Sequence, residues 1–287
     1  MIWYNIKTCY FQQSLIYDNI CKFIAENYKD DIATWLLGSP IKLTELSPTE
    51  LSNDPIRADS LILLQSDQLV LHTEFQTDTD EDMPFRMLDY RVRVYRRFPQ
   101  KEMRQVVIYL RKTSSDLVSE NSFKLNNTYH QFEIIRLWEQ PTEQFMTVPG
   151  LLPFAVLSQT KDPKMVLSQV GEAVAAITDQ KIQGNIAAAS AVLAGLVLKK
   201  DVIRKIFRSE IMRESVIYQE ILEEGEAKGI AKGEAKGKAE GIAEATKKLA
   251  LNLLRIGMSL EQISEVTELS LEQVQALEKE IRNPTSN

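Results

Sequence analysis

Cysteine and histidine are both scarce in this chain of 287 residues, which contains two of each. Cys9 and Cys21 are too few for a disulfide framework, and such usage is typical of a reducing compartment. His72 and His130 are far from each other and from both cysteines, so the ligand spacing of a structural zinc site is missing. We therefore expect a cytoplasmic protein without structural zinc.

The sequence also lacks a long apolar run. Its longest nearly apolar stretch, 186–198, is too short to cross a bilayer and contains Ser190 and Gly195. Residues 1–10 mix polar and apolar side chains, unlike a secretory signal. The hydrophobic fraction of 44% and the charged fraction of 26% are ordinary values for globular proteins. These features predict a soluble, folded protein with no membrane partner.

Positive charge is in the minority overall but is concentrated in one segment. The 34 Lys and Arg residues face 40 Asp and Glu, and the net charge of −6 argues against general coating of nucleic acid. Between Arg86 and Lys112, however, nine cationic residues are opposed only by Asp89 and Glu102. This segment could form a localised site for a polyanion.

The spacing of apolar residues predicts mixed secondary structure in the first half of the chain. Helical spacing covers 15–36 and stops near Gly38. Pro84 suits the first turn of a second helix, which extends to about Phe98. Strand-like runs lie at 57–64, 68–77, 105–110 and 129–138.

Helical patterns dominate after Pro163. Strands early and helices late predict an α/β core with an α-helical C-terminal extension. The helix candidates are 165–178, 182–198 and 201–224. We divide the chain into a core domain at 1–160, a helical extension at 161–224, a repeat segment at 225–250 and a short helical hairpin at 251–287.

The repeat segment has a glycine every four residues from Gly225 to Gly241, with Ala, Lys and Glu between them. Such a repeat could let two helices approach closely. A solvated helix or linker is the better interpretation, because nothing apolar larger than Ala or Ile lines the repeat and each interior glycine disfavours helix by about 1 kcal/mol.

Two short helices are expected in the tail. Ser259 and Ser270 each precede a glutamine by three residues, which is the spacing of a capping box. The pair is similar to a helix-turn-helix, but its second helix is acidic and would be repelled by phosphates. A packing or oligomerisation hairpin is the better interpretation.

A polar cluster is expected inside the apolar hairpin formed by 57–64 and 68–77. Symmetric closure about 65–68 would place Asp59 directly opposite Glu74, with Gln76 on the same face. A divalent cation would remove the repulsion between the carboxylates, and oxygen ligands suit Mg²⁺ or Mn²⁺. The alternative is that both acids are solvated, with Asp59 at an exposed strand start.

These residues resemble the PD-(D/E)XK nucleases. Asp59 followed after a hairpin by Glu74-Phe75-Gln76 resembles the D…E-x-K core of that superfamily, with Gln76 in place of the usual lysine. The E-x-Q form and the run MPFRMLDY at 83–90 are similar to the recombination-promoting nuclease (Rpn) and YhgA-like transposase branch, in particular cyanobacterial-type members with DUF4351-like tails. The resemblance covers about 17–138.

The resemblance implies a restriction-endonuclease-like core, in which helices flank a mixed sheet, and metal-dependent hydrolysis of DNA in recombination or on mobile elements. It implies Asp59 and Glu74 as ligands of Mg²⁺, or of Mn²⁺, and Asp59, Glu74 and Gln76 as the catalytic set. Gln76 cannot take up a proton, so it would position water or donate hydrogen bonds.

Two further roles are open. His72 shares the strand face of Glu74 and is a candidate base, although a lone histidine more often has a structural role. A further metal-binding carboxylate is expected from the N-terminal region. The candidates for it are Glu26, Glu45 and Glu50.

The basic segment supplies a candidate DNA contact. Arginines in a row can neutralise backbone phosphates, although a solvated cationic face is the alternative. On a helical wheel, the stripe contains Arg86, Tyr90, Arg93 and Arg97, and the adjacent apolar face contains Phe85, Leu88, Val92 and Tyr95.

Two functions are therefore compatible with the sequence. The first is a Mg²⁺-dependent DNA endonuclease of low sequence specificity. The second is a catalytically weak or inactive DNA-binding or assembly protein that retains the nuclease fold. In either case the C-terminal helices could support a homo-oligomer.

Overall fold

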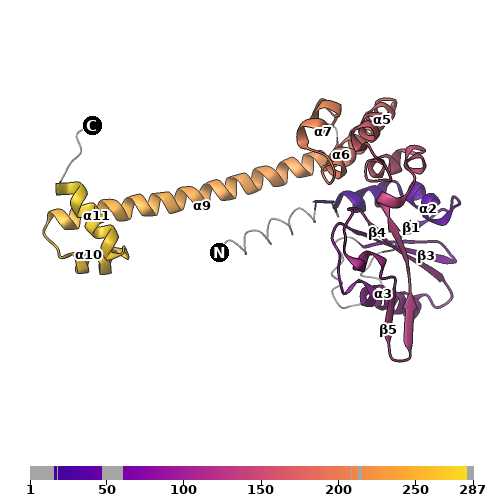
Figure 1. Ribbon diagram of the computed structural model, residues 1–287, viewed down its shortest axis with the longest axis horizontal. Coiled ribbons are helices and arrows are strands. Elements are labelled where there is room, and N and C mark those ends of the chain that lie inside the picture. Colours follow the sequence, from indigo (N-terminus) through magenta and orange to yellow (C-terminus); the bar gives the residue numbers. More distant parts are fainter. Residues whose placement is uncertain (1–15, 18, 47–60, 208, 213–214, 283–287) are drawn as a thin grey trace. The chain divides into compact units, whose positions relative to one another are not determined.

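The computed structural model describes residues 16–17, 19–46, 61–207, 209–212 and 215–282 (Figure 1). The chain divides into two compact units, Met1–Gln219 and Glu220–Asn287. The first unit contains the sheet and most of the helices, and the second consists of helices.

A five-stranded mixed sheet is the centre of the first unit. Among its three middle strands, β2 pairs antiparallel with β3, and β3 pairs parallel with β4. In spatial order the strands are β1 (Thr44–Glu45), β2 (Leu61–Gln65), β3 (Leu69–Gln76), β4 (Glu102–Tyr109) and β7 (Glu133–Arg136). The predicted α/β class is confirmed at this level, as a mixed sheet flanked by helices.

Helix α3 (Met83–Arg97) makes the crossover between the parallel strands β3 and β4 and covers one face of the sheet (Figure 1). The opposite face is covered by α2 (Lys29–Leu37) and α4 (Leu152–Ala155). On that face, the rings of Phe75 and Phe154 stack with centroids 5.5 Å apart. Strands β3 and β4 are thus covered on both sides, and their residues 70–75 and 105–109 are buried.

The rotation of α3 differs from the expected one. Its buried residues are Met83, Pro84, Met87, Tyr90 and Val94, mostly separated by three or four positions. The residues expected to face the core include Phe85 and Tyr95, which are 57% and 62% exposed. The predicted apolar face is therefore not the buried one, because Met83, Met87 and Val94 pack inward in its place.

The β2–β3 hairpin closes one residue later than the symmetric closure assumed. The Ser66 N–H donates to the Leu69 carbonyl (2.8 Å), and the Ser66 hydroxyl accepts from the Leu69 N–H (3.1 Å). Each residue of β3 therefore pairs with a β2 residue two positions later than expected, and Glu74 lies opposite Leu61. The predicted pairing of Glu74 with Asp59 was wrong, and Asp59 itself lies outside the described residues.

The predicted strand at 129–138 is two strands in different sheets. Strand β6 (Thr128–Gln131) pairs with β5 (Ser122–Leu125) in a separate hairpin, whereas β7 joins the main sheet. The break falls at Phe132, whose side chain is buried with Met87 and Val107. Anchoring this ring in the core beneath α3 separates the two strands.

The helical part of the first unit is more divided than expected. Helix α5 (Pro163–Ala175) and helix α6 (Gln180–Ala194) begin at Asp162 and Asp179, which accept hydrogen bonds from N–H groups of the first turn. The single helix expected at 201–224 is instead α7 (Lys200–Ile206), α8 (Ser209–Met212) and the start of α9 (Val216–Arg255). Short 3-10 turns are found at Asp116–Ser119 (η2), Leu137–Glu139 (η3), Thr142–Met146 (η4) and Pro149–Leu151 (η5).

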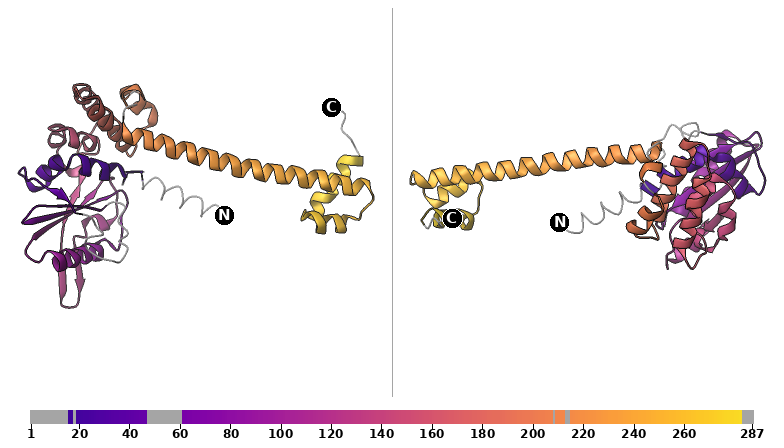
Figure 2. Two further views of the ribbon diagram at one scale, coloured as in Figure 1. Left: turned by 180° about the vertical axis from the view of Figure 1, so that it is seen from behind. Right: turned by 90° about the horizontal axis from the view of Figure 1, so that it is seen from above.

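The glycine repeat lies within α9, which Figure 2 shows as one unbroken helix. The end of α9 packs with α10 (Leu260–Thr267) and α11 (Leu271–Arg282) around Ala250, Ile263 and Val274. Both tail helices begin with the predicted capping box, at Ser259 and at Ser270. In the described part of the chain, every helix is too short or too polar to cross a membrane.

The core assignment predicts different costs for two phenylalanines. Phe75→Ala should lower the free energy of unfolding of the first unit by about 3–5 kcal/mol, because it leaves a cavity beside Phe154. Phe85→Ala should cost less than about 1 kcal/mol, because that ring is mostly exposed. Urea denaturation followed by tryptophan fluorescence measures both, and equal losses would contradict the observed rotation of α3.

Candidate functional site

Glu74 is the central residue of the site. It lies near the carboxyl end of β3 and is only 2% exposed, between Leu61 on β2 and Val107 on β4. The two-residue period of a strand places His72 and Gln76 on the same face, towards α3. The alternative of a solvated Glu74 is therefore wrong, since its carboxylate is enclosed within the protein.

Arg86 neutralises this buried charge. From the first turns of α3, its Nη1 lies 3.3 Å from Glu74 Oε2, and its Nη2 contacts the carboxylate of Asp80. Burial lowers the pKa of Arg86, but the charges of Glu74 and Asp80 outweigh it and raise the pKa overall. Arg86 therefore joins two carboxylates and is positively charged at any physiological pH.

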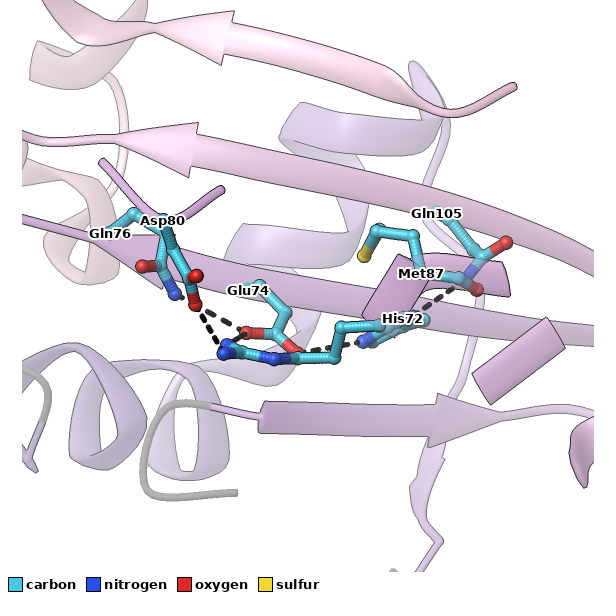
Figure 3. Close-up of polar contacts among 7 residues, drawn as sticks. His72, Glu74, Gln76, Asp80, Met87 and Gln105 are labelled. Atoms are coloured by element: carbon cyan, nitrogen blue, oxygen red, sulfur yellow. Dashed lines mark hydrogen bonds and ion pairs between the residues drawn. The ribbon is translucent and has the colours of Figure 1, made fainter. Parts of the chain in front are cut away.

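Gln76 completes the contacts of the same carboxylate oxygen. Its Nε2 donates to Glu74 Oε2 at 3.3 Å. Oε2 thus accepts from both Gln76 and Arg86, while Oε1 is directed at His72 (Figure 3). The expectation that Glu74 and Gln76 lie together is met in the structure.

His72 is fully buried, and its hydrogen bonds define its tautomer. The Gln105 amide nitrogen donates to the Met87 carbonyl at 2.7 Å and lies 2.9 Å from His72 Nδ1. A backbone carbonyl only accepts hydrogen bonds, so the Gln105 atom next to it must be the amide nitrogen and not the amide oxygen. That nitrogen has a second hydrogen, which His72 Nδ1 must accept. The proton of the neutral ring is then on Nε2, 3.6 Å from Glu74 Oε1. His72 accordingly presents a donor to Glu74, so it does not serve as a base in this state.

Tyr90 closes the site on the side of α3. It is 2% exposed, and its ring centroid lies 4.8 Å from that of His72. Burial raises the pKa of its hydroxyl well above the usual range, and the charge of Glu74 raises it further. Tyr90 is therefore uncharged and lines the cluster.

The predicted DNA-binding stripe is divided between the core and the surface. Arg86 and Tyr90 belong to the Glu74 cluster, and Arg93 forms an ion pair with Asp89 at 2.8 Å. Arg97 is exposed, with its guanidinium 6.0 Å from the ring of Phe98. The four residues do not form one surface, because α3 is rotated so that Tyr90 faces inward.

Several predicted carboxylates are not part of the described cluster. Asp59 and Glu50 lie outside the described residues. Glu26 is half-buried, and burial, followed by the charge of Glu45, raises its pKa, whereas Lys22 lowers it. The described contacts join neither Glu26 nor Glu45 to Glu74.

The chemistry of the donor set fits a divalent cation. Two carboxylates, Glu74 and Asp80, converge on one positive group, and the Gln76 amide adjoins Glu74. Carboxylate and amide oxygens are preferred by Mg²⁺ and Mn²⁺. In the described part of the chain, no three His, Cys, Asp or Glu side chains form a metal-binding group. Glu74, Asp80 and Gln76 are thus the described residues that could hold a metal. The guanidinium of Arg86 lies between the two carboxylates, where the metal would bind.

Sequence reasoning missed Asp80, Gln105 and the inward direction of Arg86. Asp80 belongs to the acidic run at 78–82, which offers no signal favouring one acid over another. Gln105 begins the apolar run of β4, and a polar residue at that point was an available signal for a buried contact. The stripe of Met83, Met87 and Val94 was the signal for the rotation of α3.

Comparison with known proteins leaves the family unassigned: no family model, curated protein or solved structure matches the chain. The interpretation of the site therefore depends on its residues and their geometry.

The tautomer assignment is directly measurable. In long-range ¹⁵N–¹H spectra, neutral His72 should show the Nε2–H form, because Gln105 occupies Nδ1. His130 gives the only other histidine signal, since the sequence contains two. Gln105→Leu should remove the preference by freeing Nδ1. An Nδ1–H form in the wild-type protein would contradict the assigned network.

Proposed function

We propose that this protein is a metal-dependent DNA endonuclease with a PD-(D/E)XK type of core, related to the recombination-promoting nuclease and YhgA-like transposase branch. One observation carries the proposal: the hairpin β2–β3 and the crossover helix α3 enclose Glu74 and Gln76 at the end of β3. A buried carboxylate that adjoins an amide and a second carboxylate is costly in a purely structural site, and is typical of functional ones.

Each residue then has a defined role in hydrolysis. Glu74 and Asp80 would hold the cation, together with Asp59 as the E-x-Q resemblance implies. When bound, Mg²⁺ polarises a phosphoryl oxygen and lowers the pKa of a bound water. Gln76 would orient water through the donor and acceptor of its amide, which does not act as an acid or a base. His72 Nε2 lies 3.6 Å from Glu74 Oε1, beyond hydrogen-bond distance, so its N–H would act on that carboxylate by electrostatic attraction alone.

The second candidate is a catalytically weak or inactive DNA-binding or assembly protein. A specific contact favours it: Arg86 already neutralises Glu74, so the buried charge is satisfied by the protein itself. Replacement of the usual lysine by Gln76 points the same way. Measured activity decides between the two candidates.

Cleavage of supercoiled plasmid tests the endonuclease. With Mg²⁺ or Mn²⁺ the wild-type protein should nick the plasmid, and Glu74→Gln should reduce the rate at least about 100-fold, because it removes the charge that holds the cation. The matched control is Glu133→Gln, whose carboxylate also pairs with an arginine but is 50% exposed. No metal-dependent nicking by the wild type, or nicking at the wild-type rate by Glu74→Gln, would refute the endonuclease.

DNA binding should depend on the exposed end of α3. Arg96 and Arg97 are exposed and follow one another in the last turn, so they are available to backbone phosphates. Replacing both with alanine should weaken binding equally for all sequences and reduce the slope of log K against log salt by about 2. Fluorescence anisotropy at several salt concentrations measures this slope.

The control for this test replaces exposed cations elsewhere. Lys161→Ala with Lys164→Ala, at the start of α5, removes two exposed positive charges and should leave the slope unchanged. Equal loss in both double variants would indicate a general charge effect and no DNA contact at α3.

A further inference from the structure

The ion pairs of Arg86 connect residues of very different accessibility. Glu74 is 2% exposed, whereas the side chains of Arg86 and Asp80 are 33% and 31% exposed. The guanidinium therefore lies at the mouth of the site, between a buried carboxylate and a partly solvated one. It is the accessible partner of the Glu74 pair.

Within the described part of the chain, the remaining contacts of Glu74 come from neutral groups. Gln76 donates an amide hydrogen to Oε2 at 3.3 Å, and the Nε2–H of His72 is directed at Oε1. Neither neutral group can balance a full negative charge in a buried position. Glu74 consequently depends on Arg86 for its counter-charge.

A divalent cation and the Arg86 guanidinium cannot share this position. Both would need the oxygens of Glu74 and Asp80, and two positive groups at that separation repel each other strongly where water is largely excluded. An arginine near the start of a helix can leave by side-chain rotation alone, since its long stem carries the charge into solvent. Exchange of one cation for the other therefore requires no movement of the sheet.

We propose that Arg86 is a tethered counter-ion that holds the cation position between Glu74 and Asp80, and that a divalent metal ion binds there by displacing its guanidinium. The inference rests on the proposed function, because it concerns the same metal site. It makes Arg86 the residue that sets the metal affinity, because its guanidinium occupies the cation position in the metal-free protein. Removing the charge of Arg86 should then strengthen metal binding.

Isothermal titration with Mn²⁺ tests the exchange in the full-length protein. Arg86→Gln keeps a donor for Glu74 but removes the competing charge, and should bind Mn²⁺ about tenfold or more tightly than the wild type. Arg86→Lys keeps the charge and should bind within about threefold of the wild type. Without metal, Arg86→Gln should melt at a lower temperature, and Mn²⁺ should raise its melting temperature more than that of the wild type.

Arg104→Gln is the matched control. Arg104 is also 33% exposed and also pairs with a carboxylate, Glu133, but its side chain reaches the carbonyl of Leu36 in α2, on the other face of the sheet. Its Mn²⁺ affinity should equal that of the wild type. An equal gain in Arg104→Gln would overturn the inference by showing that any lost positive charge has this effect.

The outcomes separate the inference from the proposed function. If the wild type binds Mn²⁺ and folded Arg86→Gln binds it equally or more weakly, Arg86 is not a competitor and the inference fails, while the metal site stands. If neither protein binds Mn²⁺, the metal-dependent function fails and the inference fails with it.

A measurement on the wild-type protein covers the case in which Arg86→Gln does not fold. Titration with Mg²⁺ should accelerate solvent exchange of the Arg86 Nη–H signals in ¹⁵N–¹H spectra, since the ion pair between Nη1 and Glu74 is broken. The Arg104 signal should not change. An Arg86 signal unaffected by saturating Mg²⁺ would overturn the proposed displacement.

Discussion

A buried carboxylate needs a positive charge close by, and Glu74 is such a carboxylate in the first unit of the protein. Arg86 supplies the charge, and Gln76 and His72 supply neutral donors around it. The supporting residues are fixed in turn, Arg86 by Asp80 and His72 by Gln105. Strands β3 and β4, helix α3 and the turn before it thus all contribute residues to the cluster around Glu74.

The rotation of α3 is compatible with this constraint. Arg86 reaches Glu74 only if the helix places Met83, Met87 and Val94 against the sheet, and this rotation also turns Tyr90 inward. Phe85 and Tyr95 are left on the surface as a consequence. The arginines of α3 therefore do not form a uniform DNA-binding face: Arg86 pairs with the buried Glu74, whereas Arg96 and Arg97, in the last turn, are exposed.

The Arg86–Glu74 contact also connects the two candidate functions. In a metal-dependent endonuclease, the guanidinium would be a resting counter-ion that yields to a divalent cation. In an inactive relative, the same contact would be permanent and the cluster would only stabilise the junction of β3 and α3. The distinction depends on whether Glu74 exchanges one cation for another, so metal affinity and Arg86 are linked.

The sequence by itself determined the local features. Apolar spacing identified the β2–β3 hairpin, helix α3, strand β4 and the mixed α/β class, and the Ser-x-x-Gln pattern identified the two tail helices. The face shared by His72, Glu74 and Gln76 also followed from sequence, because side chains alternate along any strand. Each of these features depends on neighbours within a few residues.

Only the tertiary structure decided which residues meet across elements. The Ser66 hydrogen bonds shifted the hairpin by two residues and placed Leu61 opposite Glu74. The packing of α3 selected Arg86 as the partner of Glu74, and the parallel pairing of β3 with β4 brought Gln105 beside His72. Such choices depend on the rotation of a helix and the register of a sheet, which residues distant in sequence fix together through packing.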